Sequence, residues 1–276
     1  MRLSPLAPVL ARDASSVQVG IHRPLVLAGL TASQRRFLTS LDGGRLIGAA
    51  ERRRHAALLA DLTAAGLTAS APPPPACVRF HSGSALAVEA AIALARAGRE
   101  VSFRDASPAR RDPLIATVRG GSRGALAAQR VRRAAPEAQV RSADARAELD
   151  VIVTMGVPVT RARSLLALDS PHLLVTCDER GATIGPLVVP GSTPCSQCLG
   201  LAAADRDDSW PHVALQCEAR VPRTDPLTAS VGGALAGAAA EAFLRGTAPP
   251  SWRVEDGAVE RIGPPSVHPR CACMAA

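Results

Sequence analysis

Residues 77–105 read CVRFHSGSALAVEAAIALARAGREVSFRD, in which a strand pattern, a helix pattern and a second strand pattern follow one another. A short apolar strand is expected at Cys77 to Phe80, and an Ala-rich helix at Ala85 to Ala97. The second strand ends at Asp105. This order is typical of a βαβ unit, whose two strands are parallel neighbours in one sheet.

The alternation of strands and helices continues downstream. Further helices are expected at Arg123 to Ala135 and Val231 to Leu244, and further strands at Val151 to Val153 and Leu173 to Val175. The strands are continuous apolar runs, which is typical of strands buried on both faces. We therefore expect an α/β fold: a Rossmann-type open parallel sheet with helices on both faces.

A different pattern precedes residue 72. Two short strands are expected at Val17 to Val19 and Pro24 to Leu27, and a helix with a capping box at Thr31 to Gln34. A second, long helix is expected from Ile47 to Ala65. The expected domains are therefore a winged-helix-like α+β module at 1–71, a Pro-rich linker at 72–76 and the α/β domain at 77–276.

The charge of the chain is unusual in kind. All 32 basic side chains are Arg, so mechanisms that need a lysine ammonium, such as a Schiff base or a Walker-type phosphate grip, are excluded. The first 71 residues hold 9 Arg and 4 acidic residues, and include the run Arg52-Arg53-Arg54. That run is either a solvated helix face or a contact for DNA phosphates.

No membrane segment or signal peptide is expected. The apolar stretch from Ala229 to Leu244 is shorter than the roughly 20 residues that span a bilayer. Pro5 and Pro8 interrupt the apolar run near the N-terminus, and no small-residue cleavage site follows. We expect a cytoplasmic protein, and seven cysteines, an odd number, fit a reducing compartment.

Two close cysteine pairs are the strongest local signal. Cys195 and Cys198 form a CxxC turn, and Cys271 and Cys273 form a CxC pair near the C-terminus. Four thiolates complete a tetrahedral structural zinc site with no position left for water. The alternatives are a redox CxxC or free buried thiols, and His268 is an alternative zinc ligand.

The segment from His81 to Ala87 lies where a Rossmann-type protein binds phosphates, between a strand and a helix. It has a single glycine, Gly83, flanked by Ser82 and Ser84. Asp105 follows at the position where a carboxylate takes a ribose hydroxyl. These four residues form a candidate nucleotide site, and the alternative is a structural strand-to-helix turn. The polar loop Asp205 to Pro211 is either a ligand site or a capped surface turn.

These motifs resemble the ubiquitin-activating-enzyme-like ThiF/MoeB/HesA superfamily. Ser82 to Asp105 resembles its nucleotide-binding start, and Gly185 to Leu199 its crossing strand with the first zinc pair. Val231 to Leu244 matches its C-terminal helix, and His268 to Cys273 its second zinc pair. The resemblance implies a ThiF-like domain with structural zinc, as a homodimer, in a superfamily that uses ATP to adenylate carboxylates.

The departures from that superfamily bear on activity. Ser82, Ser84 and Ala87 stand where glycines are expected, and Ser107 replaces an acidic residue. Two further elements depart as well. Arg110-Arg111-Asp112 does not reproduce an Arg-Gln element, and Arg123 falls near a Lys position, which adds it to the candidate nucleotide site. The resemblance therefore implies a degenerate site without ATP turnover.

With the small module in front, the layout resembles the cyclodehydratase partner proteins of azole-forming bacteriocin pathways. This implies a non-catalytic protein that binds a precursor or leader peptide and serves a separate ATP-using YcaO-like enzyme. One alternative is an active ThiF-like adenylyltransferase or sulfur-carrier activator that uses Asp105 and Arg123. Another is a winged-helix DNA-binding regulator.

Overall fold

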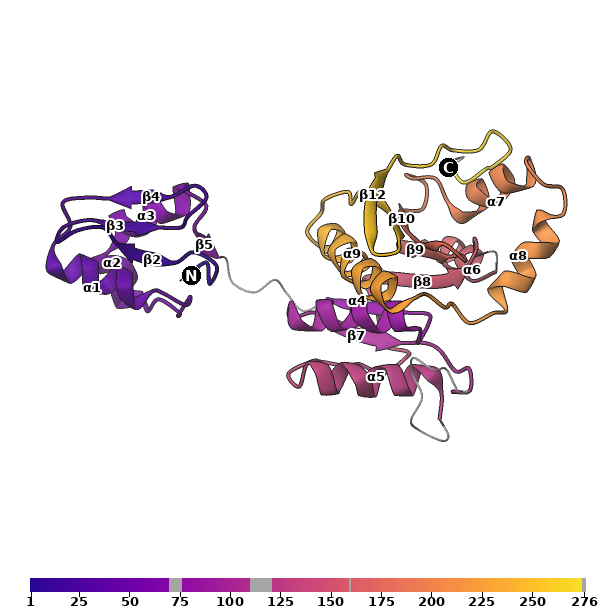
Figure 1. The fold of residues 1–276 in the computed structure, drawn as a ribbon, viewed down its shortest axis with the longest axis horizontal. Coiled ribbons are helices and arrows are strands. Elements are labelled where there is room, and N and C mark those ends of the chain that lie inside the picture. Colours follow the sequence, from indigo (N-terminus) through magenta and orange to yellow (C-terminus); the bar gives the residue numbers. More distant parts are fainter. Residues whose placement is uncertain (70–75, 110–120, 159, 275–276) are drawn as a thin grey trace. The chain divides into compact units, whose positions relative to one another are not determined.

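The computed structural model describes residues 1–69, 76–109, 121–158 and 160–274. The chain divides into two compact units, Met1–Pro74 and Pro75–Ala276, and each is described by itself (Figure 1). Two features expected from the sequence involve residues outside these ranges. Most of the Pro-rich linker at 72–76 and all of Arg110-Arg111-Asp112 lie outside the described residues.

Unit 1 is a small α+β structure. Its elements are β1 (Arg2–Leu3), β2 (Val9–Ala11), β3 (Val17–Val19), β4 (Leu25–Leu27), α1 (Ala32–Ser40), α2 (Ala49–Arg54), α3 (Ala56–Ala64) and β5 (Thr68–Ala69). The strands β2, β3 and β4 form an antiparallel sheet in that order, and β1 pairs with β5. Leu38, Leu41 and Leu62 are fully buried at the centre of its core.

The two expected strands of unit 1 are confirmed as β3 and β4. The capping box is confirmed as well, because the Thr31 side chain accepts from the Gln34 amide and the Gln34 side chain accepts from the Thr31 amide. The single helix expected from Ile47 to Ala65 is wrong. The chain leaves helical geometry at His55 (φ −115°, ψ 29°), whose ring stacks on Phe37 at 3.9 Å between ring centroids. α2 buries no side chain, so the break lets α3 turn its leucines into the core. The winged-helix assignment stays a prediction.

Unit 2 is an α/β domain. Its elements are β6 (Cys77–Phe80), α4 (Ala85–Arg96), β7 (Glu100–Phe103), α5 (Arg123–Ala134), β8 (Leu149–Met155), α6 (Thr160–Ala167), β9 (His172–Cys177), β10 (Gly181–Val188), α7 (Ser196–Ala204), α8 (Trp210–Glu218), α9 (Pro226–Leu244), β11 (Ser251–Glu255) and β12 (Ala258–Ile262). The strands form one sheet in the order β12-β11-β10-β9-β8-β6-β7.

The sheet is mixed rather than parallel as expected. β7, β6, β8 and β9 are parallel, whereas β10, β11 and β12 continue the sheet antiparallel. A turn at Asp178, whose carboxylate accepts from the Arg180 and Gly181 amides, reverses the chain between β9 and β10. The carboxyl ends of the parallel strands form one edge, where ligands usually bind in such sheets.

Helices cover both faces of this sheet, and α4 and α9 pack on one of them (Figure 1). Their backbones approach closely because α9 has small residues at the contact. A Cβ added at Gly233 would lie 2.5 Å from the Glu89 Cβ and 3.0 Å from the Ala90 nitrogen. α9 begins at Pro226 rather than at Val231 as expected. It is long and apolar enough to cross a membrane by length and composition, but here its small residues are buried against α4 and the sheet.

A buried polar network lies on the opposite face, below the loop that follows β6. The carboxylate of Asp150 is fully buried and accepts from the Arg79 Nε at 2.7 Å and the Ser170 Oγ at 2.8 Å. The His81 Nε2 donates to the same carboxylate at 2.7 Å. The network thereby holds His81, the first residue of the candidate phosphate loop.

The glycine contact gives the first testable prediction. Gly233→Ala forces a methyl group into the backbone of α4, and overpacking of this kind destabilises by about 1–3 kcal/mol. Gly200→Ala on α7 is the matched control. It has nothing within 4 Å of the added Cβ, so it should stabilise by about 0.5–1 kcal/mol through helix propensity. Denaturant unfolding measures both, and equal effects would contradict the close α4–α9 contact.

A second prediction concerns acid stability. Burial raises the pKa of Asp150, but hydrogen bonds from His81 and Arg79 outweigh burial and lower it from 3.8 to about 2. The carboxylate therefore stabilises the fold above pH 3.8, and this stabilisation is lost as pH falls towards 2. Asp150→Asn should cost about 3 kcal/mol at neutral pH, because the Arg79 charge loses its partner. The difference in free energy of unfolding between Asp150→Asn and the wild type should shrink below pH 4. The control Asp208→Asn, at an exposed position, should unfold with the same free energy as the wild type.

Candidate functional site

The loop from His81 to Ser84 connects β6 to α4, and its serines are used to build it. The Ser84 Oγ caps α4 by accepting from the Ala87 amide, and the Ser82 Oγ accepts from the Ser84 amide at 3.1 Å. Both serines are buried. Their hydroxyl groups therefore stabilise the local turn. This agrees with the alternative that the segment is a structural strand-to-helix turn.

Asp105, expected to bind a ribose, bonds to the loop itself. Its Oδ2 accepts from the Gly83 amide at 2.8 Å and lies 3.5 Å from the Arg123 Nε, and its Oδ1 accepts from the Ser107 amide at 3.1 Å. The structure thus brings Asp105, Gly83 and Arg123 together. Asp105 thus contacts both of the other candidate residues.

The start of α5 closes this arrangement. A Cβ on Gly83 would lie 2.6 Å from the Arg123 carbonyl oxygen, and one on Gly124 would lie 2.9 Å from the Asp105 carbonyl oxygen. Ser82, Asp105 and Arg123 line a cavity of only 80 Å³ with Thr154 and Arg161. Ligand pockets usually measure about 300–1,000 Å³, so this cavity among the described residues is smaller than is usual for a bound ligand.

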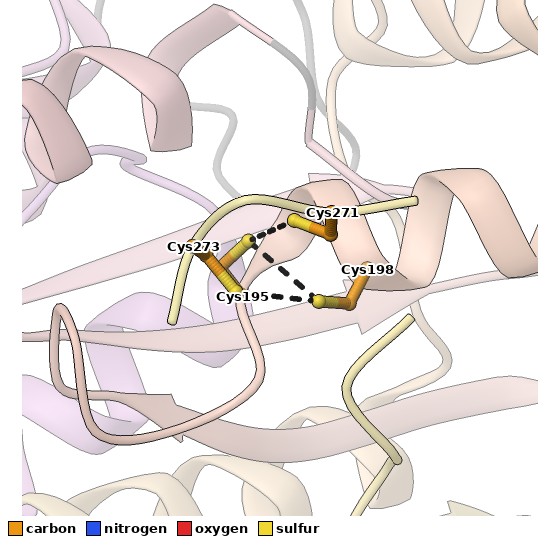
Figure 2. A group of neighbouring side chains, drawn as sticks. All are labelled: Cys195, Cys198, Cys271 and Cys273. Carbon is orange, nitrogen blue, oxygen red and sulfur yellow. Dashed lines mark hydrogen bonds between the residues drawn. The ribbon is translucent and has the colours of Figure 1, made fainter. Parts of the chain in front are cut away.

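The four cysteines of the two pairs lie together in unit 2 (Figure 2). Their Sγ atoms all lie within 4.8 Å of one another, with separations of 4.0 Å for Cys195–Cys198, 3.7 Å for Cys195–Cys271 and 3.5 Å for Cys198–Cys273. A tetrahedral zinc site with Zn–S bonds of about 2.3 Å places its sulfurs about 3.8 Å apart. The cluster can therefore hold a metal ion.

Helix α7 presents the first cysteine pair. Cys195 is its N-cap residue and Cys198 lies in its first turn, where the helix dipole favours thiolates. Burial raises the pKa of Cys198, but backbone hydrogen bonds from His268 and Cys195 outweigh it and lower the pKa to about 7. Burial raises the pKa of Cys271 and of Cys273. Metal binding would require all four thiols to lose their protons.

His268, the alternative ligand, does not join the sulfur cluster. Its Nε2 instead hydrogen-bonds the carboxylate of Asp205 at 2.8 Å. The loop Asp205 to Pro211 is in part a capped turn, since Asp207 accepts from the Ser209 amide. Trp210 at its end also lines two apolar cavities of 260 and 620 Å³, which the sequence did not suggest.

In unit 1, β4 is an edge strand of its three-stranded sheet. Between β2 and β3, the Arg12 amide donates to the Ser16 carbonyl and the Gly20 amide donates to the Pro8 carbonyl. Because hydrogen-bonded pairs alternate along an antiparallel ladder, Gln18, which lies midway, also directs its backbone N–H and C=O towards β2. Val26 lies opposite Gln18 and therefore directs its N–H and C=O away from β3. No strand of the described residues pairs with β4 on that side, and the Val26 side chain is exposed.

The same unit carries exposed positive charge. Arg52, Arg53 and Arg54 are exposed on α2 and form no ion pair with the described part of the chain. By contrast, Glu51 forms an ion pair with Arg45, with 2.7 Å between the Glu51 Oε1 and a terminal guanidinium nitrogen of Arg45. Unit 1 therefore combines an open strand edge with uncompensated guanidinium groups.

A scan against protein-family models gives no match, and a search of curated proteins gives none either. Solved structures do match. Escherichia coli MccB with AMPCPP and MccA has a TM-score of 0.61 at 14% identity, over 100% of this chain and 99% of that one. The microcin C7 biosynthetic enzyme MccB with N-formylated MccA gives 0.61 at 13% identity, over 99% of each chain.

A heterocyclase in complex with substrate and cofactor matches 99% of this chain but only 39% of its own, with a TM-score of 0.58 at 16% identity. At such identities the likeness is one of fold. The chain therefore has, along nearly its whole length, the fold of MccB.

Proposed function

We propose that this chain is a peptide-binding scaffold, which presents a precursor or leader peptide to a separate ATP-using, YcaO-like enzyme and does not itself activate the peptide. The open edge of β4 at Val26 is the observation that carries the proposal. An extended peptide can add there as a further strand, with main-chain hydrogen bonds for affinity. The exposed arginines of α2 would favour acidic peptides.

The arrangement around Asp105 supports the non-catalytic part of the proposal. A bound nucleotide would need the Gly83 amide and the Asp105 carboxylate, which bond to each other at 2.8 Å. It would also need more room than the 80 Å³ cavity offers. Adenylation would therefore require a rearrangement of the loop and of the start of α5.

The fold likeness supports a role in peptide modification. MccB is described in complex with MccA, and the heterocyclase in complex with its substrate and cofactor. Both share the fold of this chain. A cytoplasmic location and a homodimer stay predictions.

We also propose that Cys195, Cys198, Cys271 and Cys273 hold one structural zinc ion. Their sulfur separations fit a tetrahedral four-thiolate site, which leaves no position for water or substrate. Zinc would join the C-terminal segment to the start of α7. Its role would thus be to stabilise the fold, with no part in a reaction.

Metal analysis tests this site. The purified chain should hold close to one zinc per molecule, whereas Cys198→Ser should lose most of it and melt at a lower temperature. Cys217→Ser is the control, because Cys217 is a partly exposed thiol outside the cluster. A wild-type chain that takes up no zinc from a metal-buffered solution would refute the site.

Peptide docking is tested with the whole chain and random peptides displayed on phage. The selected peptides, made synthetically, should bind the wild-type chain. Val26→Pro should weaken their affinity about tenfold or more, because proline removes the outward N–H and blocks strand addition. Ala11→Pro is the matched control. Ala11 lies on the opposite edge, at β2, and also directs its N–H and C=O away from β3.

Equal loss in both proline variants, or in neither, would refute docking at β4. A duplex DNA titration separates the DNA-binding alternative. Binding through several phosphates would fall by orders of magnitude between low and moderate salt, whereas peptide binding should weaken only mildly. Tight and steeply salt-dependent DNA binding without selectable peptides would overturn the proposal.

A further inference from the structure

The segment from Gly263 to Met274 brings the second cysteine pair to the metal cluster, yet packing holds it weakly. His268 is its only buried side chain among the described residues, at 9% exposure. Pro265 to Pro269 form one wall of the 620 Å³ apolar cavity against α7. Since a cavity supplies few van der Waals contacts, other interactions must position this segment.

The contacts of His268 supply that positioning. Its Nδ1 accepts from the Arg270 amide at 3.1 Å, so its proton lies on Nε2, which donates to the Asp205 carboxylate at 2.8 Å. Its carbonyl oxygen accepts from the Cys271 amide at 2.9 Å. The imidazole is therefore joined at one end to Asp205 and at the other to the turn before Cys271.

The hydrogen bond from His268 to Asp205 connects the C-terminal segment to α7. Asp205 is the C-cap residue of α7, and the same helix carries Cys195 and Cys198 at its start. The helix thus contacts the C-terminal segment at two places: the sulfur cluster near its first turn and Asp205 at its last. Arg270 also contacts Asp205, but both groups are more than half exposed, so this ion pair adds little.

We propose that Asp205 and His268 form a latch that positions Cys271 and Cys273 for metal binding. The latch lowers the ordering cost of metal binding because it holds the second pair near the first before the ion arrives. Both are positioning residues, and neither is a ligand. The inference rests on the proposed zinc site.

Zinc affinity, measured by competition with a chromophoric chelator, tests the latch. Asp205→Ala and His268→Ala should each weaken zinc binding about tenfold, the lower range for partners that support a metal site. The double variant should be no weaker than either single one, because both remove the same bond. Asp205→Asn should retain most of the affinity, since an amide oxygen can still accept from the His268 Nε2–H.

Two controls separate the latch from surface charge. Asp207→Asn changes the same charge two residues away, where the carboxylate accepts from the Ser209 amide, and should leave affinity unchanged. Arg270→Gln removes the exposed ion pair and should have little effect. Unchanged zinc affinity in Asp205→Ala, or equal losses in Asp207→Asn, would overturn the latch.

Hydrogen exchange in the zinc-free chain tests the latch apart from the metal. The Cys271 amide, bonded to His268, should exchange more slowly in the wild type than in Asp205→Ala. If the wild type binds no zinc, the zinc site fails, while this difference in exchange still supports the latch. Equal exchange rates in the two chains would refute it.

Discussion

The proposed function of the α/β domain depends on the hydrogen bond from the Gly83 amide to the Asp105 carboxylate. In a Rossmann-type site, the amides at the start of the helix and the carboxylate at the end of the next strand both remain available to a ligand. Here they bond to each other, and the start of α5 packs so closely that only a glycine fits at position 83. Among the described residues, the candidate nucleotide residues at this edge of the sheet therefore contact one another.

Other described parts of the chain carry features that suit recognition and metal binding. Unit 1 has an open strand edge and exposed arginines, which suit an extended acidic partner. The four-cysteine cluster lies at the start of α7 and suits a structural metal that fastens the C-terminal segment. These two features support the proposed role as a peptide-binding scaffold.

Local chemistry made part of this structure predictable. The cysteine spacings predicted four thiols in one place, because a shared metal constrains residue type and spacing together. The capping box at Thr31 and the helix after Ser84 depend on neighbouring residues, and both appear as expected. The candidate nucleotide residues were also predicted to lie together, and they do.

The rest depends on contacts between distant residues. An apolar run indicates a buried strand without indicating its direction, so the antiparallel strands β10 to β12 were missed. At the helix break, the His55 ring stacks on Phe37 of another helix, a contact that sequence spacing does not reveal. The Asp150 network and the Asp205–His268 bond join residues far apart in the sequence, for which spacing carries no signal.

Pyrophosphate–ATP exchange tests the central claim most directly. In adenylation, a carboxylate oxygen would attack the α-phosphorus of ATP, so that the adenylyl group is transferred and the bond to the α,β-bridging oxygen breaks with release of pyrophosphate. The reversal of this step would place labelled pyrophosphate in ATP. The whole zinc-loaded chain, with a selected peptide at saturation and Mg²⁺ present, should show no exchange above background. Exchange that depends on the peptide and is lost in Asp105→Ala would contradict the claim and identify the chain as an adenylyltransferase.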